Sequence, residues 1–485
     1  MLDLFLINFS FSDLTIVGFS VFVFAVLGVL SAIQALMTTR TSQGAIAWSV
    51  TLLTLPFVAV PAFWILGRNK FIGYVDARRG QAGEVFKDLE EATRTIEPYV
   101  VNLGKQYGEA RALEKLARMP FTSHNDTRLL VDGAETFKAI FDGIESAREY
   151  VLVEFFIIND DELGRQLKEI LIRKAQAGVA IYLLYDDVGS SRISNAYLQD
   201  LHASGVQVTG MKTTRGWGNR FQLNFRNHRK IVVVDGRVAF IGGHNVGDEY
   251  MGKHAKLTPW RDTHLEFSGP AVLSAQLTFV EDWYWATEQI PKIRWEPQPS
   301  QNSNQTVFVL PSGPADEFET CGLFFMHAIN SAKERIWIAT PYFVPDEGII
   351  TALQLAALRG VEVRILIPGL PDKPMIKMAA MTYVPQVTEA GVEMYEYGDG
   401  FMHQKVVLVD QGLAAVGTAN FDNRSFRLNF EVTVLTIDDE FACEVEQMLV
   451  KDFSKSTRID PADLASRPWW SKLGGKVARL FAPVL

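Results

Sequence analysis

Two segments of the sequence place histidine, lysine, aspartate and asparagine at one common spacing. Residues 228–245 and 403–420 both read H-x-K, four residues, D, six residues, G-x-x-N. The first copy supplies His228, Lys230, Asp235, Gly242 and Asn245, and the second supplies His403, Lys405, Asp410, Gly417 and Asn420. A single copy could be accidental, whereas two copies at one spacing indicate a repeated functional unit.

Each copy contains the residue types that phosphate-ester chemistry uses. An imidazole acts as a nucleophile or carries a proton, and an ammonium group attracts phosphate oxygens. The asparagine amide adds hydrogen-bond donors, and glycine allows close backbone approach. Two such sets around one phosphate would supply a nucleophile, an acid and two cations, as phosphodiester exchange requires. The alternative, polar residues that merely end buried strands, is reasonable for one copy but not for a matched pair.

The repeated unit is predicted to be a β-hairpin, because an apolar run, an Asp-Gly turn and a second apolar run follow one another. Side chains two residues apart share one face of a strand, so His228 and Lys230 point the same way. Asp235 and Asp410 fall at the turns. The sequence leaves open whether these two aspartates are catalytic or cap the turns.

The surroundings of the motif also repeat. A strand, helix, strand, helix, strand pattern at 127–186 recurs after a segment rich in Pro, Gln, Asn and Ser at 295–305. A chain of 485 residues is too long for one ordinary domain. We predict an α/β fold of two pseudo-symmetric lobes, 126–294 and 306–466, each a mixed sheet flanked by helices, with 295–305 as linker.

Two uncharged segments precede the lobes, one between Asp13 and Arg40 and one between Arg40 and Arg68. Both are long enough to span a bilayer. A signal peptide would begin with a basic region, but residues 1–13 contain two Asp and no Lys or Arg. A buried core helix rarely stays uncharged for more than about twenty residues. We therefore predict a transmembrane hairpin over 1–69, with spans at about 14–37 and 44–67.

Basic residues flank the end of the second span, at positions 68, 70, 78 and 79. This asymmetry predicts that the body faces the cytoplasm. Residues 70–125 are charged and favour helix, so we predict a juxtamembrane helical segment. The C-terminal segment 467–485 mixes large apolar residues with Lys472, Lys476 and Arg479. It is expected either to lie on an anionic membrane or to pack on the body as an ordinary helix.

The composition limits which cofactors and which classes of substrate are expected. Cys321 and Cys443 are the two cysteines, which fits a reducing compartment. The 8 histidines form no metal-ligand spacing, so we predict no metal and no other cofactor. Residues 1–67 carry a net −1 of the total −9, which leaves an acidic body and disfavours a nucleic-acid substrate. A locally basic stretch at 213–230 is either a solvated face or a site for anionic headgroups.

At these motifs the chain resembles the phospholipase D superfamily, whose signature is the duplicated H-x-K-x4-D-x6-G-x-x-N motif. The segments TSQGAIAW (41–48), WRDTH (260–264), TPYFVPDEGI (340–349) and NRSFRLNFE (423–431) resemble bacterial cardiolipin synthases. The resemblance implies that one His attacks phosphorus, while the other protonates the leaving alcohol and deprotonates the incoming one. It implies a catalytic set of His228, Lys230, Asp235, His403, Lys405 and Asp410, with phosphate bound by Asn245, Asn420 and Thr418.

The resemblance further implies that in each lobe a carboxylate downstream of the motif orients the histidine, at Asp262 and Glu431. Family members often carry Ser after the motif glycine, where this chain has Gly243 and Thr418. The two lobes are therefore expected to bind phosphate unequally. The sequence does not decide which histidine is the nucleophile, although the superfamily more often uses the first, His228.

For this subfamily the resemblance implies phosphatidylglycerol as donor and acceptor, cardiolipin and glycerol as products, and a multi-pass protein of the bacterial inner membrane. Phosphatidylethanolamine as donor, hydrolysis by water, and a membrane-anchored phosphodiesterase or nuclease stand as alternatives. A scaffold without activity is disfavoured, because all four His and Lys positions are intact. The oligomeric state, including a homo-oligomer, stays open.

Overall fold

The structure, a computed structural model, describes residues 11–67, 71, 74, 94–103, 110–211 and 224–482. The chain forms two compact units. The N-terminal unit comprises residues 1–72 and 213–225, and the larger unit comprises residues 73–212 and 226–485. Most of the predicted juxtamembrane segment lies outside the described residues. Its described part contains the 3₁₀ helix Glu97–Tyr99, helix α6 (Ala110–Ala117) and the start of the first strand.

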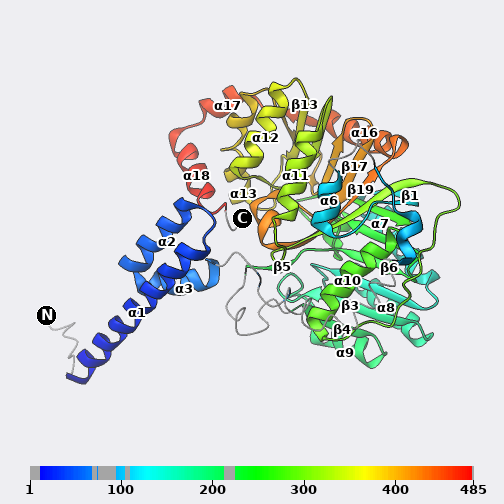
Figure 1. Cartoon of the computed structure of the whole chain (residues 1–485), viewed down its shortest axis with the longest axis horizontal. Helices are drawn as coiled ribbons and strands as arrows, with labels where there is room; N and C mark the ends of the chain where they lie inside the picture. The colour runs from blue at the N-terminus through cyan, green and yellow to red at the C-terminus, as the bar shows by residue number, and fades with distance from the viewer. Residues whose placement is uncertain are drawn as a thin grey trace. The chain divides into compact units, whose positions relative to one another are not determined.

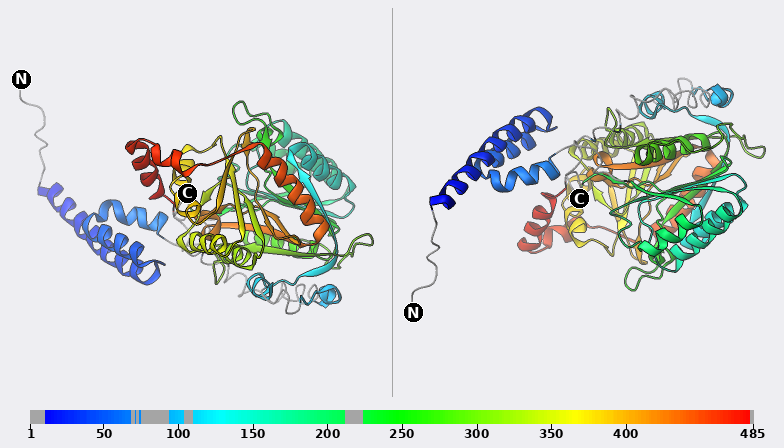
Figure 2. Two further views of the ribbon diagram at one scale, coloured as in Figure 1. Left: turned by 90° about the horizontal axis from the view of Figure 1, so that it is seen from above. Right: turned by 90° about the horizontal axis from the view of Figure 1, so that it is seen from below.

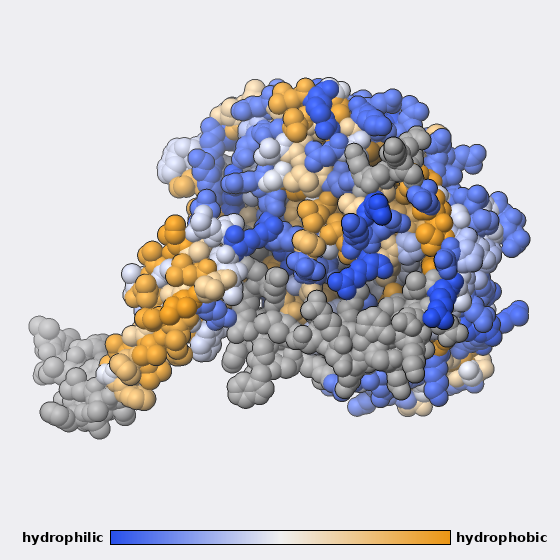
Figure 3. Space-filling model, viewed as in Figure 1, coloured by the Kyte–Doolittle hydropathy of each residue, from blue (hydrophilic) through white to orange (hydrophobic). Residues whose placement is uncertain are grey.

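The described part of the N-terminal unit contains three helices, α1 (Phe11–Thr38), α2 (Ser42–Thr54) and α3 (Pro56–Leu66). Residues Val17–Thr38 of α1 are long and apolar enough to cross a membrane. Ala35, Leu52 and Phe63 are buried where the three helices pack together. Large apolar side chains, among them Phe19 and Phe22, cover the outside of this unit (Figure 3).

The second predicted span is not one continuous helix. It consists of α2 and α3, of 13 and 11 residues, which meet at Leu55. Pro56 explains the break, because proline lacks an N–H and its ring disfavours helical geometry in the preceding residue. At 1.5 Å per residue neither helix alone reaches the roughly 30 Å of a bilayer core. Of the predicted hairpin, only the first arm forms one helix with the length and apolar composition of a span.

The larger unit is built on a mixed sheet (Figure 1). In its strand order β1 (Thr122–Val131) and β10 (Gln305–Ser312) pair antiparallel at the centre. Outward from β1 the order is β9 (Thr263–Ser268), β7 (Val238–Gly242), β6 (Ile231–Val234), β2 (Tyr150–Phe155), β3 (Ala180–Asp186) and β4 (Gln207–Met211). Outward from β10 it is β19 (Asn429–Ile437), β17 (Leu413–Gly417), β16 (Val406–Val409), β11 (Arg335–Ala339), β13 (Glu362–Pro368), β14 (Glu393–Tyr397) and β20 (Ser456–Arg458). The two halves repeat one strand order about the β1–β10 pair, which confirms two pseudo-symmetric α/β lobes.

Helices cover both faces of this sheet (Figure 2). The first lobe has α7 (Asp132–Ser146), α8 (Glu162–Gln176), α9 (Asn195–Ala203) and α10 (Val272–Thr287). The second lobe has α11 (Thr320–Ser331), α12 (Glu347–Leu358), α13 (Pro374–Ala380), α14 (Val384–Thr388), α15 (Asn423–Arg427) and α16 (Asp439–Ser454), followed by α17 (Pro461–Ser466) and α18 (Trp469–Arg479). Asp161, Asp346 and Asp438 cap α8, α12 and α16 by accepting backbone N–H groups. The helices bury one apolar cluster in each lobe.

The repeated motif forms a β-hairpin in each lobe, as the sequence predicts. Strand β6 pairs antiparallel with β7 in the first lobe, and β16 pairs with β17 in the second. Asp235 and Asp410 begin the turns with φ of 51° and 50°, in the left-handed region that aspartate tolerates better than most residues. Each histidine precedes the first strand of its hairpin, and each aspartate follows it.

Candidate active site

Two short parallel pairings connect the lobes beside the histidines. Strand β5 (Arg226–Asn227) pairs with Asn429–Phe430 at the start of β19, and β15 (Phe401–Met402) pairs with β8 (Trp260–Arg261). The next residue of each strand is a histidine on one side and a carboxylate on the other. Backbone hydrogen bonds extend both pairings, from His228 N to Phe430 O at 2.9 Å and from His403 N to Arg261 O at 2.7 Å.

Each histidine therefore pairs with the carboxylate of the opposite lobe. His228 Nδ1 lies 2.9 Å from Glu431 Oε2 and 3.0 Å from Oε1, and His403 Nδ1 lies 2.7 Å from Asp262 Oδ2. The family resemblance implied an orienting carboxylate in each lobe, and in the structure each of these carboxylates faces the histidine of the other lobe. Because Nδ1 is held by the carboxylate, Nε2 is the ring nitrogen left for chemistry.

The two motif lysines are buried in the same region. Lys230 Nζ donates to the carbonyl of His228 at 2.7 Å, and Lys405 Nζ donates to the carbonyl of His403. Burial lowers the pKa of Lys230 to about 7 and that of Lys405 to about 8, against the attraction of nearby carboxylates. Each ammonium uses one donor within the protein, and the other donors can face an anion.

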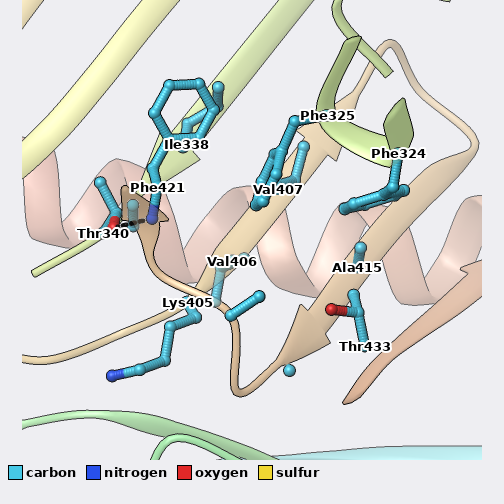
Figure 4. A pocket seen from close by; sticks show the side chains of 13 residues that line it. Phe324, Phe325, Ile338, Thr340, Lys405, Val406, Val407, Ala415, Phe421 and Thr433 are labelled. Atoms are coloured by element: carbon cyan, nitrogen blue, oxygen red, sulfur yellow. Dashed lines mark hydrogen bonds between the residues drawn. The ribbon is translucent and has the colours of Figure 1, made fainter. Parts of the chain in front are cut away.

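Lys405 also lines a small cavity in the apolar interior of its lobe. A cavity of about 10 Å³ under α11 is lined by Phe324, Phe325 and other apolar side chains together with Lys405. The Lys405 side chain is directed away from Phe325 and Val407 (Figure 4). A cavity of this size holds at most about one water molecule, so it is not a substrate site.

The two histidine–carboxylate pairs differ electrostatically. Burial raises the pKa of Glu431 to about 7, although Lys230 and hydrogen bonds oppose it. Burial also opposes ionisation of Asp262, but the charges of His244, His403 and Lys405 outweigh it and hold its pKa below the usual range. Burial and Lys405 lower the pKa of His403 to about 4, against the attraction of Asp262. Burial and the lysine charges lower the pKa of His228 well below its ordinary value.

Glu431 is held by hydroxyl and amide donors of its own lobe. Thr418 Oγ1 donates to it at 2.6 Å, Ser425 Oγ at 2.8 Å and Asn429 Nδ2 at 3.1 Å. The predicted phosphate-binding hydroxyl of Thr418 is therefore directed at the carboxylate. Sequence reasoning missed Ser425 and Asn429, although both lie in the segment NRSFRLNFE, which carried the family resemblance.

Gly243 occupies the matching place beside Asp262 for a steric reason. A Cβ atom at position 243 would lie 2.0 Å from Asp262 Oδ1. Asp262 instead accepts from Thr263 N at 2.8 Å, and Trp260 Nε1 lies 3.5 Å from its Oδ2. Gly243 and Thr418, where family members often carry Ser, thus lie beside two different carboxylates, Asp262 and Glu431.

The two motif asparagines are also used differently. Asn245 donates through Nδ2 to Tyr250 Oη at 2.8 Å and accepts from Ile157 N at 3.1 Å. Asn420 Oδ1 is buried, and among the described residues no hydrogen-bond partner reaches it. The structure brings both asparagines to the same ends of the sheet strands as the histidines.

Asp235 and Asp410 lie at the other ends of the motif strands. Six residues of extended chain lie between each aspartate and its histidine, roughly 20 Å. Asp235 accepts the backbone N–H groups of residues 148, 149 and 150 at 2.8 to 2.9 Å. Asp410 accepts those of residues 333, 334 and 335 at 2.8 to 3.1 Å. These aspartates fasten the hairpin turns to the starts of β2 and β11, which favours the turn-capping alternative over a place in the catalytic set.

Two buried arginines brace the crossed pairs. Arg229 pairs with Asp282 on α10 at 2.6 Å and donates to the Glu431 carbonyl at 3.0 Å. Arg261 holds both oxygens of Asp452 on α16, at 2.8 and 2.9 Å. Arg229 therefore belongs to the interior and not to the basic surface predicted at 213–230. Positions 215 and 220 of that stretch lie outside the described residues.

Two further histidines lie behind Asp262. His244 and His264 are fully buried with ring centroids 5.6 Å apart. No hydrogen-bond partner reaches either ring nitrogen of these two within the described part of the chain. The matching positions of the second lobe are Ala419 and Thr433. The described residues contain no group of three or more metal-binding side chains.

The fold and site define a two-lobed phospholipase D-like protein, and comparison with known proteins agrees. The chain belongs to the family described as "Cardiolipin synthase, PLD-like domain", whose model matches residues 140–256 and 325–453.

Among curated relatives, it is 48% identical to cardiolipin synthase A of Pseudomonas fluorescens over 97% of this chain and 98% of the relative. It is 49% identical to cardiolipin synthase A of Pseudomonas putida over 95% and 96%. The crystal structure of phosphatidylserine synthase from Haemophilus influenzae shares the fold, with a TM-score of 0.60 at 16% identity, over 78% of this chain and 100% of that one.

Proposed function

We propose that this protein transfers a phosphatidyl group from one phosphatidylglycerol to another, forming cardiolipin and releasing glycerol. The observation that carries the proposal is the meeting of two histidine–carboxylate pairs and two lysines between the lobes. The close similarity to cardiolipin synthases along nearly the whole chain supports the substrate class.

In the first step one histidine Nε2 attacks the phosphorus of the donor lipid. A P–N bond forms, the P–O bond to glycerol breaks, and the other histidine gives its Nε2 proton to the leaving oxygen. Lys230 and Lys405 offset the charge on the phosphate oxygens, and the amides of Asn245 and Asn420 add donors. Thr418 acts through Glu431 and does not contact the phosphate.

In the second step the hydroxyl of a second phosphatidylglycerol gives its proton to the histidine that acted as acid. Its oxygen then attacks the phosphohistidine, the P–N bond breaks and cardiolipin leaves. The proton that the acid histidine gives in the first step returns in the second, and each bond that breaks is matched by one that forms.

We assign the nucleophile to His228 and the proton carrier to His403. Burial lowers the pKa of both histidines, so a neutral imidazole does not distinguish them, and the assignment rests on the two carboxylates. His403 faces Asp262, whose own pKa is held low, so an ionised carboxylate stabilises the imidazolium formed when His403 accepts a proton. Glu431, with a pKa raised to about 7, gives His228 less negative charge at neutral pH.

We further propose that the enzyme is a multi-pass protein of the bacterial inner membrane with its lobes in the cytoplasm. The apolar helix Val17–Thr38 and the family support membrane association. The predicted division into 1–69, 70–125, two lobes and a C-terminal segment belongs to the same proposal. Labelling of introduced cysteines from either side of sealed vesicles tests the orientation.

The reaction is tested by incubating the full chain in detergent with phosphatidylglycerol alone and resolving the products. Cardiolipin with an equal amount of glycerol supports transfer. Phosphatidic acid as the sole phospholipid product would identify a hydrolase, and degradation of single-stranded DNA without lipid turnover would identify a nuclease. Addition of phosphatidylethanolamine tests the donor range.

The two histidine roles are tested with a donor whose leaving group is p-nitrophenol, which departs without a proton. The variant His403→Asn should release one burst of nitrophenol per enzyme and retain a phosphatidyl group on His228. The matched variant His228→Asn should give no burst. The reverse pattern would exchange the two roles and leave the overall reaction standing.

A further inference from the structure

The C-terminal helix α18 turns its large apolar side chains away from the protein. Trp469, Trp470 and Leu480 are 74%, 64% and 77% exposed. Leu473, Val477 and Phe481 lie on the same side and are also about half exposed. A helix that packs on a globular body normally turns its apolar face inward. In α18 this arrangement is inverted.

The inward face of α18 is made of small residues. A Cβ at Gly474 would lie 2.9 Å from Met378 Cε, and one at Gly475 would lie 2.9 Å from Thr382 Cγ2. Ala478 on the same face is buried. Small residues let α18 lie close against α13, and the two helices are side by side in Figures 1 and 2. The two sequence hypotheses for this segment are therefore compatible, because the helix packs on the body and still presents an apolar face.

A basic edge runs between these two faces. With 3.6 residues per turn, positions 472, 476 and 479 follow one another along one side of the helix. Arg479 lies over the ring of Tyr383 at 4.3 Å, while Lys472 and Lys476 flank the exposed tryptophans. Outward tryptophans beside lysines are typical of helices that lie in the interface of an anionic bilayer. With 11 residues, about 16 Å, α18 is too short to span one.

Exposed apolar side chains also lie on α13 and in the segment that precedes it. Met375 and Leu370 are 44% and 42% exposed. Helix α13 begins directly after Lys373, and the neighbouring Asp372 accepts a hydrogen bond from Tyr342 Oη at 2.5 Å. Next to Tyr342, β12 (Phe343–Val344) pairs with β18 (Phe421–Asp422), which follows Asn420 directly. Through Asp372 and Tyr342, the segment before α13 thus contacts the strand pair that adjoins Asn420, a predicted phosphate-binding residue.

We propose that the outer faces of α18 and α13 dock on the surface of an anionic phospholipid bilayer and hold the second lobe, with its half of the active site, close to it. The apolar side chains enter the headgroup region, and Lys472 and Lys476 meet lipid phosphates. The docking deepens the proposed function, on which it rests for its lipid substrate. It brings the second lobe close to the bilayer that contains the proposed lipid substrate.

The test uses the full chain in nanodiscs of phosphatidylglycerol and phosphatidylcholine, with a nitroxide attached to Leu473→Cys. The exposed Cys443 is first replaced by Ser, and the buried Cys321 is kept. The matched control is Leu358→Cys, 73% exposed at the end of α12. Leu358 and α13 lie at opposite ends of β13, a strand of 7 residues and about 23 Å.

The label at 473 should collide readily with oxygen and poorly with a water-soluble nickel complex, whereas the label at 358 should show the opposite. Free collision of the 473 label with nickel would overturn the proposal. Poor access for both reagents would also overturn it and would indicate a protein contact, either the N-terminal helices or a second copy. In phosphatidylglycerol discs, Lys472→Gln with Lys476→Gln should weaken the protection several-fold, and in pure phosphatidylcholine the pair should have little effect. None of these readings requires turnover, so failure of the proposed reaction is separately visible.

Discussion

His403 and Asp262 are joined by a hydrogen bond of 2.7 Å although they belong to different lobes. His228 and Glu431 form the reciprocal pair. The physical cause is local, since β15 lies parallel to β8 and β5 lies parallel to the start of β19. Each half of the site is therefore completed by the other lobe.

The crossed pairing is tested by the nitrophenol burst of His403→Asn, which depends on His228 alone. Adding Glu431→Gln should slow that burst by about 10²- to 10⁴-fold, because the neutral amide no longer stabilises the imidazole that attacks. Adding Asp262→Asn should leave the burst close to that of His403→Asn, because Asp262 serves the histidine already removed. Pairing within each lobe predicts the opposite ranking of the two double variants.

The Thr418 hydroxyl is predicted to influence the pH dependence of activity, through the pKa of Glu431, and not the affinity for phosphate. Its hydroxyl donates to Glu431, so Thr418→Val should raise the pKa of Glu431 above about 7. Activity needs the ionised carboxylate, so the acidic limb of kcat/KM against pH should move to higher pH, with kcat at pH 7 reduced about tenfold. Thr418→Ser keeps the donor and serves as control. A large rise in KM with an unmoved limb would instead place the hydroxyl on the phosphate.

Anion affinity should fall as the lysines lose their protons. The pKa of Lys405 is lowered to about 8, so the charged form dominates below that pH and is lost above it. Binding of tungstate, a phosphate mimic whose own charge is constant in this range, should weaken about tenfold between pH 7 and pH 9. Calorimetric titration measures it. Lys405→Arg keeps its charge and should remove the part of the loss centred near pH 8, while the part centred near pH 7 belongs to Lys230 and should remain. An unchanged loss near pH 8 in that variant would contradict the assignment.

Asp235 is predicted to contribute to stability and not to chemistry. Asp235→Ala leaves three backbone N–H groups without an acceptor and should lower the free energy of unfolding by about 3 kcal/mol, with kcat per folded enzyme unchanged. Thermal unfolding followed by tryptophan fluorescence measures the difference. Asp142→Ala removes only an exposed ion pair with Lys138, and its effect should stay below about 0.5 kcal/mol.

The contribution of Asp235 to the free energy of unfolding should depend on pH. Burial opposes ionisation of Asp235, but the backbone N–H groups of residues 148–150 outweigh it and lower its pKa. The contribution is therefore present above the ordinary aspartate pKa of about 4 and is lost as pH falls through the lower folded value. A variant as stable as the unmodified protein at pH 7, but inactive, would return Asp235 to the catalytic set.

Much of the fold followed from local patterns in the sequence. The apolar run, turn and second apolar run at residues 231–241 were sufficient for the β6–β7 hairpin, because a turn and its two strands are contiguous. The break at Leu55 was missed even though Pro56 provides its cause. The length of the uncharged stretch outweighed that signal, since proline is tolerated in spanning helices.

The sequence by itself determined which residues carry the chemistry. The doubled motif fixes two histidines and two lysines at one spacing, and the repeated order around them determines two lobes. Tertiary structure alone decided how the lobes share these residues. The exchange of Asp262 and Glu431 depends on strands 141 and 203 residues apart, and the outward face of α18 depends on its packing against α13. The periodicity of apolar residues indicates only the strand or helix to which a residue belongs. Its partner in another element is set by how the elements pack.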